Sequence, residues 1–179
     1  MEALVKQAQQ GILQDCCEIV LVFANTAAAK GLISAQRSGI PTAVIESQGQ
    51  RRADFDRAVV ALLEPLQLDY IVLAGYLRIL SPLFIARYHN RIINIHPADT
   101  AAYQGMHGYE WALEQNLQYT KITVHLVDEG VDTGRVLAQR DVDLRGATTL
   151  ADIQQRGLAV EHALYSETLR DVLTGQLSI

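Results

Sequence analysis

The sequence predicts an α/β fold: an open, mostly parallel sheet, mixed at one side, with helices on both faces. Short apolar runs of strand length recur along the chain, as in Glu18–Ala24 (EIVLVFA) and Tyr70–Ala74 (YIVLA). Segments with helical periodicity separate these runs at the spacing of right-handed crossover connections. Two strand-like runs near the C-terminal end, Lys121–Val127 and Arg135–Leu144, have no helix between them, so that side of the sheet is expected to be mixed.

The composition indicates one globular domain, residues 1–179. Of the 179 residues 49% are hydrophobic and 20% charged, and a chain of this length buries about 70% of its unfolded surface. A net charge of −5 argues against a nucleic-acid partner, and no apolar stretch is long enough for a membrane span. The two cysteines, Cys16 and Cys17, are adjacent, which disfavours a disulfide between them. We therefore expect a cytoplasmic protein with small-molecule substrates.

The first half of the chain alternates between helix and strand. Met1–Gly11 contains good helix formers and ends on a glycine, which suits the end of a helix. Glu18–Ala24 is a nearly continuous apolar strand, and Asn25-Thr26 offers a cap for the alanine-rich helix that follows. Ile40–Ile45 is a second strand, and Ala53–Leu66 is a helix with its apolar residues on one face.

The second half begins with a third buried strand, Tyr70–Ala74. Ser81-Pro82 then provides a cap and a proline at the first position of a short helix, Leu83–Tyr88. A further helix is expected over Gly108–Asn116. After the two C-terminal strands, Thr149–Leu173 closes the chain as a long amphipathic helix.

The run Arg91–Pro97 (RIINIHP) predicts a buried strand that ends at His96. Ligands of open parallel sheets bind beyond the carboxyl ends of the strands, and Asn94 and His96 share one face of this strand. A histidine suits acid–base chemistry near neutral pH, and an asparagine amide can stabilise an oxyanion. In the turn-rich segment after Val127, Asp132 is the candidate that could raise the His96 pKa and fix its tautomer.

Other interpretations of these residues remain open. A histidine before a proline is often only a strand-end residue with a backbone hydrogen bond. His96, His107 and His125 with a nearby aspartate could bind zinc, but their spacing matches no zinc motif. His125 alternates with apolar residues, which favours a core or supporting role. No GxSxG motif indicates a nucleophilic serine.

Five segments together resemble the family of phosphoribosylglycinamide formyltransferases, over nearly the whole chain. The segments are Val72–Pro82 (VLAGYLRILSP), Arg91–Pro97 (RIINIHP), Tyr103–Gly108 (YQGMHG), Val124–Gln139 (VHLVDEGVDTGRVLAQ) and Glu161–Tyr165 (EHALY). The resemblance implies a Rossmann-like formyltransferase fold. It also implies transfer of a formyl group from 10-formyltetrahydrofolate, the co-substrate, to glycinamide ribonucleotide in purine biosynthesis, without a metal.

The resemblance also assigns roles to residues. Asn94, His96 and Asp132 match the catalytic residues of the family. The folate pocket maps onto Arg52, Leu77, Arg78, Ile79, Leu80, Asn94, Asp128, Glu129, Gly130, Val131 and Asp132. The ribonucleotide site maps onto Leu158, Ala159, Val160 and Glu161. Without the resemblance, Arg52 and Arg78 could equally be solvated surface residues.

The chain departs from the family pattern at two places. The family opens with a strand and a glycine-rich phosphate-binding loop, whereas Met1 aligns with the helix that follows them. We therefore expect the strands beside that position to lack a ladder partner and phosphate binding to lose its main support. Two hypotheses are open: Met1 is an internal residue of a longer natural chain, or the shorter form exists and is impaired. The second departure, Ala98–Ala101 (ADTA), leaves the substrate contacts of that loop undefined.

Three alternative functions follow from these departures. The chain could formylate another amine such as an amino sugar, hydrolyse the formyl-folate, or bind folate as a catalytically impaired paralogue. An unpaired sheet edge could also favour a homodimer.

Overall fold

A computed structural model describes residues 1–179 and has six helices and six strands. The helices are α1 (Glu2–Gln10), α2 (Lys30–Arg37), α3 (Arg52–Leu63), α4 (Pro82–Arg87), α5 (Gly108–Glu114) and α6 (Leu150–Leu173), and a short 3₁₀ turn, Glu64–Leu66, follows α3. The strands are β1 (Val22–Ala24), β2 (Thr42–Val44), β3 (Ile71–Val72), β4 (Ile92–His96), β5 (Tyr119–Leu126) and β6 (Val136–Asp143). The α/β class expected from the sequence is confirmed.

The strands form two sheets rather than one. β1 and β2 pair in parallel, and the other four strands follow the order β3-β4-β5-β6. β3 and β4 are parallel, while β5 is antiparallel to both β4 and β6, which gives the expected mixed side. β1 and β3 each have one partner only, as the missing ladder partner led us to expect.

An apolar cavity of about 700 Å³ separates the two sheets and is lined by residues of β1, β3 and α1. The Val22 N–H donates to the Pro41 carbonyl at 2.9 Å, and the Ile71 N–H donates to the Arg91 carbonyl at 2.8 Å. Backbone groups alternate in direction along a strand, so those of Phe23 and Val72 point to the opposite, unpaired edges.

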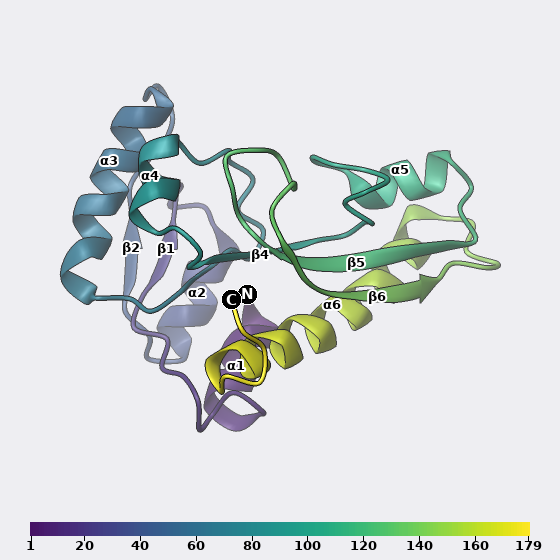
Figure 1. Cartoon of the computed structure of the whole chain (residues 1–179), viewed down its shortest axis with the longest axis horizontal. Coiled ribbons are helices and arrows are strands. Elements are labelled where there is room, and N and C mark those ends of the chain that lie inside the picture. The colour runs from purple at the N-terminus through teal and green to yellow at the C-terminus, as the bar shows by residue number, and fades with distance from the viewer.

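Two hydrophobic cores cover the two faces of β4. Ile93 packs with residues of β5, β6 and α6, whereas Ile92 packs with residues of α3 and α4. Figure 1 shows α3 and α4 together on one side of the molecule and α6 running along β5 and β6. Because both faces of β4 are covered, its position is fixed.

Several element boundaries differ from the sequence-based expectations. β1 covers Val22–Ala24 and β3 only Ile71–Val72, and both are shorter than expected. α2 begins after Ala29 instead of at Asn25-Thr26, and no side chain caps it; the Asn25 amide donates to Ser47 Oγ at 3.0 Å, and the Ala27 N–H donates to Glu46 Oε1 at 2.8 Å. The predicted cap at Ser81 is confirmed, because its side chain accepts from the Phe84 N–H, and the Thr149 side chain likewise caps α6 by accepting from the Asp152 N–H. None of the helices combines the length and apolarity needed to cross a membrane.

Candidate active site

β4 delivers two polar side chains to the edge of the sheet. The strand ends at His96, and Pro97 has no N–H to continue the ladder. Asn94 and His96 point to the same side of the strand. Asn94 is half-buried and His96 is buried. Both line a second cavity, of about 710 Å³.

The loop between β5 and β6 carries Asp132 to this edge. Asp128 Oδ1 accepts from the Gly130 N–H at 3.1 Å and from Thr133 Oγ1 at 2.7 Å, which closes the turn. Asp132 has a positive φ of 53°, a conformation that aspartate tolerates better than most residues. Gly134 passes so close to the Leu126 carbonyl that a Cβ would overlap it. The loop therefore turns back on β5 and directs Asp132 towards β4.

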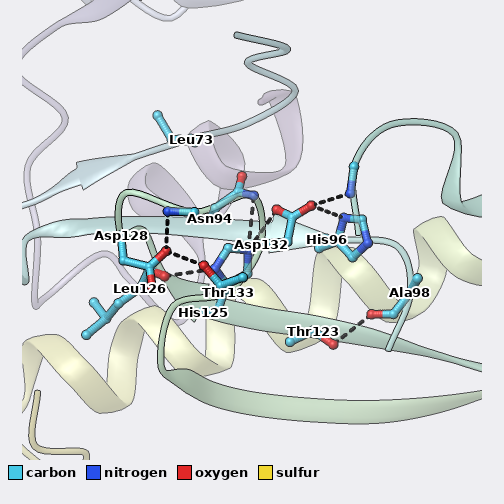
Figure 2. A network of polar contacts seen from close by, with 12 residues as sticks. Leu73, Asn94, His96, Ala98, Thr123, His125, Leu126, Asp128, Asp132 and Thr133 are labelled. Atoms are coloured by element: carbon cyan, nitrogen blue, oxygen red, sulfur yellow. Dashed lines mark hydrogen bonds and ion pairs between the residues drawn. The ribbon is translucent and has the colours of Figure 1, made fainter. Parts of the chain in front are cut away.

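The Asp132 carboxylate lies beside the His96 imidazole, as Figure 2 shows. Asp132 Oδ2 is 3.4 Å from His96 Nδ1 and accepts from the Gly105 N–H at 2.8 Å. The other ring nitrogen, Nε2, lies 3.0 Å from the Tyr103 carbonyl oxygen. A carbonyl can only accept, so Nε2 carries the hydrogen in neutral His96. Nδ1 is therefore the nitrogen that can take up a proton, and Asp132 faces it.

For both His96 and Asp132, burial and the surrounding polar groups shift the pKa in opposite directions. Burial lowers the pKa of His96 below its ordinary value of 6.5, and the opposing effects of Asp132 and the Tyr103 carbonyl are smaller. The contribution of Asp132 thus has the expected sign, but burial sets the net direction. Burial raises the pKa of Asp132, but contacts with His125, the Gly105 N–H and His96 outweigh it and hold that pKa below 3.8. Near neutral pH the pair is an uncharged imidazole beside a carboxylate.

A second histidine, His125 of β5, lies on the other side of Asp132 (Figure 2). Its Nε2 is 3.2 Å from Asn94 Nδ2 and 3.4 Å from Asp132 Oδ1. Its Nδ1 lies 2.8 Å from the Leu126 carbonyl oxygen. The sequence favoured a core or supporting role for His125, and the antiparallel register that pairs it with Asn94 was not readable there.

Most residues assigned to the folate pocket line the second cavity. They are Arg52, Leu77, Arg78, Ile79, Leu80, Asn94, Asp128, Gly130, Val131 and Asp132, whereas Glu129 does not line it. The Arg78 guanidinium lies 4.5 Å from the centre of the Phe55 ring, and its Nε is buried without a hydrogen-bond partner. A cavity of this size, with both apolar and polar lining residues, fits a drug-sized polar heterocycle.

The segment Leu158–Glu161 lies on α6 and does not line that cavity. Leu158 and Ala159 are exposed, and the Glu161 carboxylate accepts a hydrogen bond from the Tyr109 hydroxyl. Burial raises the pKa of Glu161 above its ordinary value. Glu161 is thus the one member of this segment with a defined polar contact to another element.

Sequence reasoning missed two backbone groups that organise the site. The Tyr103 carbonyl fixes the His96 tautomer, and the Gly105 N–H holds Asp132. Neither contact depends on the side chain of the residue that makes it, so no residue type in the sequence could reveal it. The arrangement as a whole can accept a proton at His96 Nδ1 and donate a hydrogen bond from the Asn94 amide. Those two capacities suit attack by an amine on an acyl-type carbon.

Comparisons with known proteins agree with this chemistry. A protein-family model described as formyl transferase matches residues 1–169. The phosphoribosylglycinamide formyltransferase of Escherichia coli (strain K12) is 35% identical over 159 residues, which are 88% of this chain and 75% of that protein. The human trifunctional purine biosynthetic protein adenosine-3 is 33% identical over 100% of this chain, which spans only 18% of its length.

The similarity extends to three dimensions. The crystal structure of phosphoribosylglycinamide formyltransferase from Bacillus halodurans has a TM-score of 0.90 at 34% identity, covering 97% of this chain and 89% of that one. The chain therefore belongs to the formyl transferase family.

Proposed function

We propose that this protein transfers the formyl group of 10-formyltetrahydrofolate to the primary amine of glycinamide ribonucleotide, a step of purine biosynthesis in the cytoplasm. The observation that carries the proposal is the His96–Asp132 pair at 3.4 Å, with the proton-accepting Nδ1 facing the carboxylate beside the Asn94 amide. The name of the Escherichia coli relative, 35% identical, supports this choice of acceptor. The two free cysteines fit a reducing compartment.

Each of the three residues would have one task in the reaction. The amine nitrogen attacks the formyl carbon, and the Asn94 amide donates a hydrogen bond to the oxygen as it gains charge, a contact typically worth about 3 to 4 kcal/mol. His96 Nδ1 takes the proton that the amine loses, and Asp132 stabilises the resulting imidazolium. The bond from the formyl carbon to the folate nitrogen then breaks, and the proton passes from His96 to that nitrogen.

Two regions would hold the substrates. Arg52, the segment Leu77–Leu80 and the loop Asp128–Asp132 would hold the formyl donor. Leu158–Glu161 would hold the ribonucleotide, because the Glu161 carboxylate can accept hydrogen bonds from hydroxyl groups. The amine and the formyl group would then meet at His96.

The test measures consumption of 10-formyltetrahydrofolate by the purified protein with glycinamide ribonucleotide, with an amino-sugar nucleotide, and with no acceptor. We expect consumption only with the ribonucleotide. Consumption without an acceptor would instead assign hydrolysis, and activity confined to the amino sugar would assign another acceptor.

The first prediction concerns His96 itself. We expect His96→Ala to reduce kcat by roughly 10² to 10⁴, because general acid–base catalysis by one side chain is typically worth that factor. Steady-state kinetics checks the rate, and circular dichroism checks that the variant is folded. A folded His96→Ala variant with the full transfer rate would contradict the proposed mechanism.

A further inference from the structure

The buried His125 ring has no part in the mechanism above, although it contacts two of the three residues that do. We propose that His125 is a positioning residue that holds the Asn94 amide with its amino group as the hydrogen-bond donor in the site. The inference rests on the proposed formyl transfer. The ring is 2% exposed, and its Nε2 lies 3.2 Å from Asn94 Nδ2.

The backbone determines which nitrogen of His125 carries a hydrogen. Nδ1 lies 2.8 Å from the Leu126 carbonyl oxygen, which can only accept, so Nδ1 is the donor. In the neutral ring Nε2 then has a free lone pair. That lone pair can accept one N–H of the Asn94 amide, whose amino group can only donate.

Two neighbouring groups favour different protonation states of His125 Nε2. The Asp132 carboxylate favours a proton there, whereas the Asn94 amino group requires the lone pair. Asn94 Nδ2 is at 3.2 Å, within the ordinary hydrogen-bond range, while Asp132 Oδ1 is at 3.4 Å, just outside it. The other Asp132 oxygen already accepts from the Gly105 N–H at 2.8 Å. These distances favour the contact with Asn94.

The consequence concerns the orientation of the amide. With one N–H bonded to His125, the second N–H of Asn94 remains free to donate to an oxyanion. If His125 carried a proton on Nε2, it would repel the amino group and turn the amide oxygen towards the ring. The Asn94 amino group would then no longer face the oxyanion, and the lone pair of the amide oxygen would lie nearer the developing negative charge.

The first test is spectroscopic and needs no active variant. In ¹⁵N NMR of the histidine-labelled protein, with His125→Gln used to assign the signal among the five histidines, we expect the neutral Nδ1–H form for His125 near neutral pH. A doubly protonated ring, or a hydrogen on Nε2 alone, would overturn the proposal. This readout does not depend on turnover, so its result can be interpreted whichever acceptor the protein formylates.

The second test is a double-mutant cycle. We expect His125→Leu to lower kcat roughly 10- to 100-fold with little change in KM, as for other groups that orient a reacting residue, and His125→Gln, which keeps an acceptor, to lose less. In an Asn94→Ala background, His125→Leu should lower kcat little further, because His125 acts on the reaction only by orienting Asn94.

The cycle also separates positioning from general stability. Thr168→Val is the matched control, since this buried hydroxyl bonds only the Leu164 carbonyl within α6, at 2.7 Å. We expect it to leave kcat unchanged. An undiminished loss from His125→Leu in the Asn94→Ala background would refute the positioning role. If the unmodified protein transferred no formyl group to any acceptor, the proposed function would fail instead.

Discussion

Asp132 and burial act on the pKa of His96 in opposite directions, and this balance sets the chemistry of the single residue. Burial is the larger effect and lowers the pKa of the imidazole below its ordinary value of 6.5. Asp132 opposes burial and would stabilise the imidazolium that forms when His96 accepts a proton. His96 is therefore unprotonated at neutral pH and can act as a base, and Asp132 stabilises the imidazolium once it forms.

This balance predicts the pH profile of Asp132→Asn. Removing the carboxylate removes an effect that raises the His96 pKa, so that pKa should fall further and the acid limb of kcat/KM should move to lower pH. The maximal rate should fall about 100-fold or more, because the imidazolium loses its counter-charge. The pH dependence of kcat/KM for the variant and the unmodified protein checks both. An acid limb that moves to higher pH would contradict the assignment.

At the scale of elements, one buried carboxylate ties α3 to the start of α4. Asp56 is 1% exposed and accepts from the Ser81 N–H at 2.5 Å, while the Ser81 side chain caps α4. The Gly75–Leu80 segment that lines the site cavity lies between these two helices in the chain. The contact between Asp56 and Ser81 therefore anchors the end of a segment that lines the site, in addition to stabilising the fold.

Asp56→Ala should lower the free energy of unfolding by about 1 to 3 kcal/mol, the cost of leaving a buried N–H unsatisfied. Asp54→Ala is the control on the same helix, because its partners Arg51 and Arg57 are exposed and surface pairs contribute little. Urea denaturation followed by circular dichroism compares the two. Equal effects would show that the Ser81 contact is not a stabilising bond.

At the scale of the whole molecule, the sheet is divided and two strand edges face an apolar cavity. Hydrogen exchange should reveal this division. We expect the amides of Val22 and Ile71, which are bonded to neighbouring strands, to exchange at least about fivefold more slowly than those of Phe23 and Val72, as one hydrogen bond of ~1 kcal/mol implies. Amide exchange by NMR measures all four. If the amides of Phe23 and Val72 exchanged as slowly as those of Val22 and Ile71, these strand edges would be paired.

The sequence predicted the order and type of the elements and the two site residues on β4, because hydrophobic periodicity and capping are local properties. It did not predict where α2 begins, because the residues before this helix bond to a distant segment: Asn25 donates to Ser47 and the Ala27 N–H donates to Glu46. The segment Arg91–Pro97 is informative for the same local reason: its apolar residues define a strand, and Asn94 and His96 interrupt them on one face.

By itself, then, the sequence determined the α/β class, the position of Asn94 and His96 at a strand end, and the candidates for the pocket. Only the tertiary structure decided that Asp132 reaches His96, that His125 stands on its other side, and that Tyr103 fixes the tautomer. The reason is physical. These contacts depend on the antiparallel register of β4 with β5 and on a loop that turns back over Gly134, and neither is written in the spacing of residues along the chain.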